Sequence, residues 1–182
     1  MRALLRWAQA INAMTEWVGR LAGWLLPLAI LVGTWNVASR YLGRWLGVDL
    51  SSNAFLEAQW YLFSLVFLLG AGYVLKHNEH VRVDVLYQRW SRRRKAWVNL
   101  IGALVFLVPF CLVVLYFSWG FVANSWQILE SSPDPGGLPR YPIKTVIPIG
   151  FGLLLLQGLA EAVKNWAVLR GQLPAQEASH ER

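Results

Sequence analysis

Few side chains in this sequence could do chemistry. His77 and His80 share a polar connection with Asp84, and Cys111 stands alone inside an apolar run. A haem held between helices needs histidine ligands within them, and a disulfide or a cysteine-based metal site needs a second cysteine. No catalytic triad, phosphate loop or metal-ligand cluster is visible. The sequence therefore predicts no cofactor, no metal and no enzyme activity.

Polar residues also border the long apolar stretches. Glu57 opens one stretch, and Glu161 lies near the end of another, one helical turn after Gln157. A proton-coupled exporter would carry a carboxylate in the middle of a span, because such groups mark ion pathways. Neither glutamate has that position. Gln157 and Glu161 have two interpretations, contact with a partner helix or solvation among lipid headgroups.

Asn36 and Arg40 lie one turn apart near the end of the first apolar stretch. If the first two stretches form neighbouring antiparallel helices, Arg40 comes within reach of Glu57. We expect Arg40 and Glu57 to form an ion pair that packs the two helices together near the membrane interface, rather than a transport site.

The composition is that of a membrane protein. Of the 182 residues, 56% are hydrophobic and only 15% are charged, whereas a soluble domain has about 25% charged residues. The net charge of +7 suggests nucleic acid at first sight. The basic residues, however, lie at the ends of apolar runs rather than on one polar face, a pattern that sets membrane orientation. Nucleic acid is therefore excluded as a partner.

Four stretches approach the roughly 20 apolar residues that a spanning helix needs. They are residues 21–39, 55–75, 96–119 and 146–168. Their middles contain no Lys, Arg, Asp or Glu. The sequence thus predicts an all-α membrane protein with one four-helix domain over residues 21–169.

Two prolines bear on the shape of these helices. The third helical pattern continues to about residue 128, so we expect it to tilt, kink at Pro109 or project beyond the membrane. Pro148 is expected in the first turns of the fourth span, where its missing N–H costs little.

The two ends of the chain differ from its middle. Residues 1–20 are amphipathic and predict a helix lying in the membrane interface. The alternative is that this segment simply extends the first span. Residues 170–182 are expected to form a flexible cytoplasmic tail.

Lys and Arg are distributed unequally between the two sides. Of 17 basic residues, 13 fall before the first span, between the second and third, or at and beyond the end of the fourth. By the positive-inside rule, both termini and the 76–95 connection are cytoplasmic. A basic run in that connection is predicted to anchor the topology and meet anionic lipid headgroups. It comprises Arg89, Arg92, Arg93, Arg94 and Lys95.

Several short motifs follow one another along the chain. They are Trp35-Asn36-Val-Ala-Ser-Arg40-Tyr41, Glu57, Lys76-His-Asn-Glu-His80-Val-Arg82-Val-Asp84, Arg140-Tyr141-Pro142-Ile-Lys144, Pro148 and Gln157. Together with the four spans, they resemble the small, four-span Q-type membrane subunit of the tripartite ATP-independent periplasmic (TRAP) transporters. The resemblance covers about residues 17–166.

This resemblance implies a non-catalytic subunit in the bacterial inner membrane. Such subunits pair with a large membrane subunit that holds the substrate and sodium sites and moves as an elevator. A periplasmic binding protein delivers an organic acid to it. The small subunit is then a fixed scaffold, in a one-to-one complex. The alternatives are a stand-alone four-span structural or assembly protein and, less in keeping with the missing reactive groups, a membrane enzyme.

Two connections are assigned roles on this basis. Arg82 and Asp84 are predicted to shape the cytoplasmic turn, with Asp84 as N-cap of residues 85–90, and the alternative is an ordinary solvated loop. Residues 131–142 are rich in proline and glycine, which predicts an irregular external loop. Asp134 and Arg140 in that loop are candidate contacts for the binding protein, and contact with the large subunit or plain connection are the alternatives.

Overall fold

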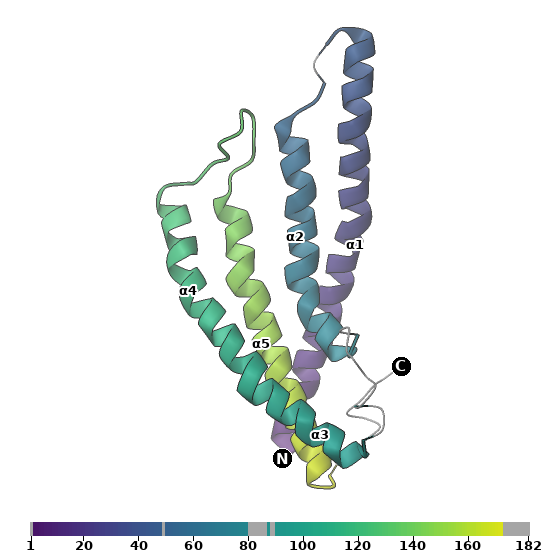
Figure 1. The fold of residues 1–182 in the computed structure, drawn as a ribbon, viewed down its shortest axis with the longest axis vertical. Coiled ribbons are helices and arrows are strands. Elements are labelled where there is room, and N and C mark those ends of the chain that lie inside the picture. The colour runs from purple at the N-terminus through teal and green to yellow at the C-terminus, as the bar shows by residue number, and fades with distance from the viewer. Residues whose placement is uncertain (1, 49, 80–86, 88–89, 173–182) are drawn as a thin grey trace.

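The protein is a bundle of long helices in the computed structural model, which describes residues 2–48, 50–79, 87 and 90–172 (Figure 1). The helices are α1 (Arg2–Leu46), α2 (Asn53–Lys76), α3 (Arg92–Ile101), the π-helix η2 (Gly102–Leu107), α4 (Val108–Gln127) and α5 (Tyr141–Leu169). Because α3, η2 and α4 are continuous, four helical units are long and apolar enough to cross a membrane. The predicted all-α, four-span fold class is confirmed.

The bundle has two different ends (Figure 1). At the loop end, residues 47–52 join α1 to α2 and residues 128–140 join α4 to α5. At the basic end lie the start of α1, the end of α2, the start of α3 and the end of α5. α2 contacts α1 and α5, and α5 also contacts α1, α3 and α4. The helix α5 is therefore the centre of the bundle.

The first helix is a single element of 45 residues. At 1.5 Å per residue it is about 67 Å long, against about 30 Å for the hydrocarbon core of a bilayer. Residues 2–20 are thus continuous with the first span, as the alternative for this segment predicted. Whether this half of α1 lies in the membrane interface stays a prediction.

Small and polar residues line the packed face of α1 at intervals of seven. They are Ala8, Thr15, Ala22, Ala29, Asn36 and Gly43, and all are buried. A seven-residue repeat keeps one face toward a neighbour along the whole helix, and small side chains let membrane helices approach closely. Close packing against α2 and α5 follows from this repeat.

Of the alternatives for the third helical pattern, the structure shows an irregularity beside Pro109, a π-helical segment immediately before it. Pro109 has no N–H to donate to the preceding turn, and the N–H of Val108 reaches back five residues to the carbonyl of Ala103. An insertion of this kind is a recognised way for a helix to change direction. In Figure 1, α4 slants across α5 and diverges from it toward the loop end.

The fourth spanning helix begins earlier than expected. α5 starts at Tyr141, so Pro142 occupies its first turn and Pro148 lies inside the helix. The placement of Pro148 in the first turns was therefore wrong, and so was the inclusion of Tyr141 and Pro142 in the loop. Proline is tolerated at the first turn because that N–H has no helical partner in any case.

Candidate functional site

At the loop end, the carboxylate of Glu57 fastens the 128–140 connection to α2. Glu57 is only 2% exposed. Its Oε1 accepts a hydrogen bond from the Ser132 hydroxyl, and its Oε2 accepts one from the Leu138 N–H at 2.5 Å. The Arg140 guanidinium lies 3.9 Å from Oε1. One carboxylate therefore closes the loop from both sides.

Two further side chains of α2 bind backbone carbonyls of the same loop. The Asn53 side-chain amide donates to Pro135 O, and the Tyr61 hydroxyl donates to Pro139 O, both at 3.0 Å. Carbonyls of irregular backbone lack the hydrogen-bond donors that a helix or sheet would provide. Here the side chains of α2 provide these donors. The loop is thus shaped by a helix about 80 residues earlier in the sequence.

The expected pairing of Arg40 with Glu57 is wrong. The cation beside Glu57 is Arg140, and the other contacts of its carboxylate come from the loop. Arg40 lies on the exposed surface of α1, next to Tyr41, which is 68% exposed. Asn36 is buried on the packed face of α1. The loop supplies a nearer set of donors than the neighbouring helix does.

A second carboxylate fixes the junction between the loop and the two helices that it joins. Glu130 accepts hydrogen bonds from the Lys144 ammonium and, at 2.7 Å, from the Ser125 hydroxyl. The bond from Lys144, and then the one from Ser125, lower the pKa of Glu130 because they favour its charged form. Nearby, the Trp126 indole N–H donates to the Thr145 hydroxyl at 2.8 Å.

The two residues predicted as binding-protein contacts differ in accessibility. Asp134 is exposed at the apex of the loop. The side chain of Arg140 is 31% exposed and turns toward Glu57, and its Nε is buried without a hydrogen-bond partner. Asp134 is therefore available to another molecule, whereas Arg140 belongs mainly to the loop's own structure.

At the basic end, the carboxylate of Glu16 in α1 contacts a lysine, a histidine and an arginine side chain. Its carboxylate lies 2.7 Å from Lys76 Nζ and 2.8 Å from His77 Nε2, both at the end of α2. Arg20, one turn further along α1, donates to it at 2.8 Å. This cluster fixes the point at which the chain leaves α2.

Gln157 joins α1 to α5. Its side chain is completely buried, and its Nε2 donates to Asn12 Oδ1 at 2.9 Å and to Glu161 Oε1 at 3.0 Å. Lys164 Nζ lies 2.5 Å from the same Glu161 oxygen. The partner-helix interpretation of Gln157 is confirmed, the partner being α1 of the same chain, and exposure to headgroups is excluded for this residue.

Several predicted site residues lie outside the part of the chain that the structure describes. They are His80, Arg82, Asp84 and Arg89. The predicted cap at Asp84 therefore stays a prediction. Arg92, Arg93 and Arg94 are exposed in the first turn of α3, and the ammonium of Lys95 lies 5.0 Å from the ring centre of Tyr87.

Sequence reasoning missed the residues that complete each cluster. Ser132 and Asn12 were not singled out. The buried positions of α1 at intervals of seven, such as Thr15, were not singled out either. That repeat was readable from the sequence. The role of Ser132 was not, because its partner Glu57 is remote along the chain.

In the described part of the chain, the polar side chains of both ends make hydrogen bonds and ion pairs between elements of the same chain. Within the described ranges, no three His, Cys, Asp or Glu side chains come together as a metal-binding group. Donors of the same chain engage the carboxylates of four glutamates, Glu57, Glu130, Glu16 and Glu161. What the site does is hold helices and one loop in place.

Comparison with known families identifies the chain. The model of the family "Tripartite ATP-independent periplasmic transporters, DctQ component" matches residues 29–168. The chain belongs to this family. It is therefore a small multi-pass membrane subunit of a TRAP transporter, and not an enzyme.

Two curated relatives are named as TRAP transporter small permease proteins. The ectoine TRAP transporter small permease protein TeaB of Halomonas elongata is 27% identical over 150 residues, covering 81% of this chain and 75% of the relative. The C4-dicarboxylate TRAP transporter small permease protein DctQ of Vibrio cholerae is 26% identical over 147 residues, covering 69% of this chain and 62% of the relative. No solved structure matches the chain significantly.

Proposed function

We propose that this TRAP small subunit is a fixed scaffold for a large, elevator-type membrane subunit. The observation that carries the proposal is the location of the charged side chains. Those that the structure describes on the spanning helices lie toward the two ends, where carboxylates hold elements of the same chain. A transported ion or anionic substrate needs polar or charged groups near the bilayer centre. This subunit is organised for rigidity instead.

The finer assignments follow the family resemblance. We infer sodium-coupled uptake of an organic acid, delivered by a periplasmic binding protein. The named cargoes of the relatives, ectoine and C4-dicarboxylate, differ between two small subunits that are both similar to this chain. That difference supports a substrate choice made by the other subunits.

The distribution of basic residues supports an orientation in the inner membrane. We place the basic end, with both termini, in the cytoplasm and the loop end in the periplasm. In this orientation the exposed Asp134 faces the compartment of the binding protein. The loop held by Glu57 is then a preformed contact surface, either for the binding protein or for the large subunit.

Copurification tests the scaffold. The full chain, tagged and expressed with its neighbouring reading frames, should bring a large polytopic membrane protein with it in mild detergent, in a one-to-one ratio. Cross-linking from a photoreactive group at Asp134 during uptake should label the binding protein. A pure homo-oligomer without a larger partner would overturn the proposal and favour the stand-alone structural protein.

A further inference from the structure

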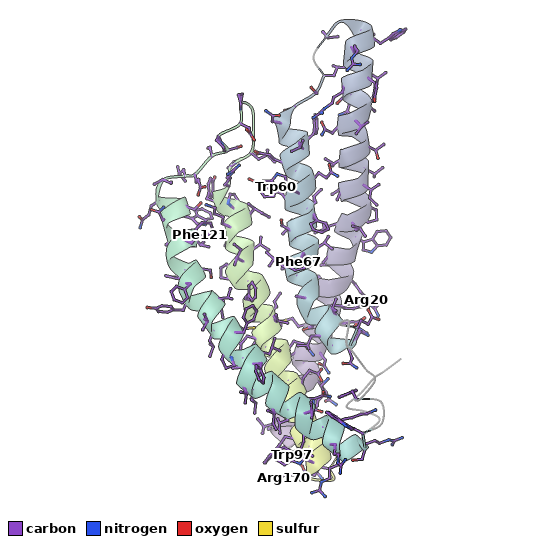
Figure 2. All side chains as sticks on the ribbon, in the orientation of Figure 1. Arg20, Trp60, Phe67, Trp97, Phe121 and Arg170 are labelled. Atoms are coloured by element: carbon purple, nitrogen blue, oxygen red, sulfur yellow. The ribbon has the colours of Figure 1, made fainter. Side chains whose placement is uncertain are left out.

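Three helices converge at the basic end, and each brings arginine and tryptophan to the surface. α1 carries Arg6 and Trp7, and α3 carries Arg93 and Trp97. α5 carries Trp166, and Arg170 follows directly after its last residue. All six residues are exposed. Figure 2 shows the labelled Trp97 and Arg170 together at this end of the molecule.

Helix contacts place the cationic residues of α1 and α5 at one level. These helices run antiparallel (Figure 1) and touch where Gln157 donates to Asn12 at 2.9 Å. Each helix rises about 1.5 Å per residue. Arg2 and Ala167 each lie ten residues beyond that contact, so the start of α1 lies beside the end of α5.

The same reasoning places α3 beside α5. Leu100 of α3 and Ala162 of α5 share one buried cluster, and Leu169 packs against it. Arg93 and Arg170 lie seven and eight residues beyond this contact in antiparallel helices. Residues that are 77 positions apart in the sequence therefore come to the same end of the bundle.

The surface formed in this way is strongly positive. Its exposed arginines are Arg2, Arg6, Arg92, Arg93, Arg94 and Arg170. At this end, the acidic residues that the structure describes on α1, α3 and α5 are Glu16 and Glu161. Lys76, His77 and Arg20 engage Glu16, and Lys164 and Gln157 engage Glu161. The first turn of α3 contains no acidic residue, although acidic residues are the ones favoured at a helix start. The arginines there do not serve the stability of the helix.

We propose that the basic end is a composite binding site for the headgroup of an anionic phospholipid, built jointly by α1, α3 and α5. The arginines contact the phosphate, since guanidinium binds phosphate oxygens bidentately. The exposed indoles lie at the boundary between headgroups and acyl chains, where tryptophan is enriched. The guanidinium of Arg170 lies 4.9 Å from the ring centre of Trp166, so one cation is already held on one aromatic anchor.

The proposed lipid site requires more than the basic run that sets the membrane orientation. A topology anchor needs only positive charge in the connection between two spans. Arg170 is outside that connection, yet the packing of α3 against α5 brings it to the same end of the bundle. The proposal therefore predicts that Arg93 and Arg170 act on one lipid together, and it does not depend on the large subunit.

Lipid binding to the purified full-length subunit tests the site. Native mass spectrometry would measure its affinity for phosphatidylglycerol and for phosphatidylcholine. We expect clear preference for phosphatidylglycerol, and each of Arg93→Gln and Arg170→Gln should weaken its binding about fivefold. The double variant should lose less than the product of the two effects, because residues that share one ligand are coupled. Arg170→Lys should retain most of the affinity.

The loop end provides the matched control. Arg40→Gln with Arg44→Gln removes two exposed arginines there and should leave the preference unchanged. Equal affinity for the two lipids, or fully independent effects of Arg93 and Arg170, would overturn the composite site. Copurification with the large subunit tests a separate property, so failure of the lipid site and failure of the scaffold are distinguishable.

Discussion

The loop end and the basic end each rely on a glutamate of one helix, but in different ways. Glu57 binds a hydroxyl and a backbone N–H of one irregular loop and is 2% exposed. Glu16 binds the ends of flexible side chains and is 21% exposed. A backbone N–H cannot move without moving the loop, whereas a lysine can adjust its rotamer. The loop end therefore specifies a shape, and the basic end specifies which helices are neighbours.

The largest effect is expected at Glu57. Glu57→Ala removes the acceptor of the Leu138 N–H and the counter-ion of Arg140, and unsatisfied polar groups strongly destabilise the arrangement that contains them. We expect protease cleavage within residues 131–140 to become roughly tenfold faster or more. Cleavage of the variant at the wild-type rate would show that Glu57 does not shape the loop.

Three variants refine that test. Asp134→Asn, at the exposed apex, should leave the cleavage rate unchanged. Arg140→Gln should accelerate cleavage less than Glu57→Ala, because its contact is the longest of the three. Arg40→Gln should have no effect, and a Glu57/Arg40 charge swap should give no rescue.

A glycine between the two ends tests how tightly the helices are packed. A Cβ at Gly150 would lie 2.8 Å from the Leu68 carbonyl oxygen, so α2 and α5 would have to separate. Gly150→Ala should destabilise the subunit by about 1–3 kcal/mol, measured by thermal unfolding in detergent. Gly152→Ala meets nothing within 4 Å and is the control on the same helix. Equal effects of the two substitutions would contradict the close contact.

At the basic end, the cations around Glu16 should not contribute equally. Lys76 is 16% exposed, and its loss in Lys76→Met should cost about 1–2 kcal/mol. Arg20 is 74% exposed, and Arg20→Gln should cost about 0.3–0.5 kcal/mol because water screens an exposed ion pair. Thermal unfolding of the two variants measures the difference. If Arg20→Gln destabilised the subunit as much as Lys76→Met does, burial would not determine how much each cation contributes to stability.

The smallest effect near neutral pH is expected from Glu130. Its pKa is lowered in the folded state, so its contribution is complete above the ordinary glutamate pKa of about 4.3 and is lost as the pH falls below that value. Protection of the loop from an acid-active protease should therefore stay constant from neutral pH to about 5 and then decline. Lys144→Met should reduce the decline. An unchanged decline in that variant would exclude the Glu130–Lys144 pair as its cause.

The local sequence pattern was sufficient to predict the helices, but it was not sufficient to predict the contacts between them. The spans and the polar nature of both ends followed from hydropathy and residue type. The irregularity beside Pro109 was one of three alternatives that the length of the third helical pattern left open. The start of α5 was misplaced by five residues, because Tyr141 and Pro142 look like loop residues although proline suits a first turn. The partner of Glu57 was also misassigned, since Arg40 and Arg140 are equally plausible until the loop's path is known.

By itself, the sequence determined that the chain crosses a membrane four times and carries its charges at the helix ends. Both properties follow from the cost of charge in hydrocarbon and from the length that a helix needs. Only the tertiary structure decided that Glu57 closes a loop through Ser132 and Leu138, that Gln157 binds α1, and that the start of α3 packs beside the end of α5. These contacts join residues far apart in the sequence, so they depend on which helices pack together and at what level.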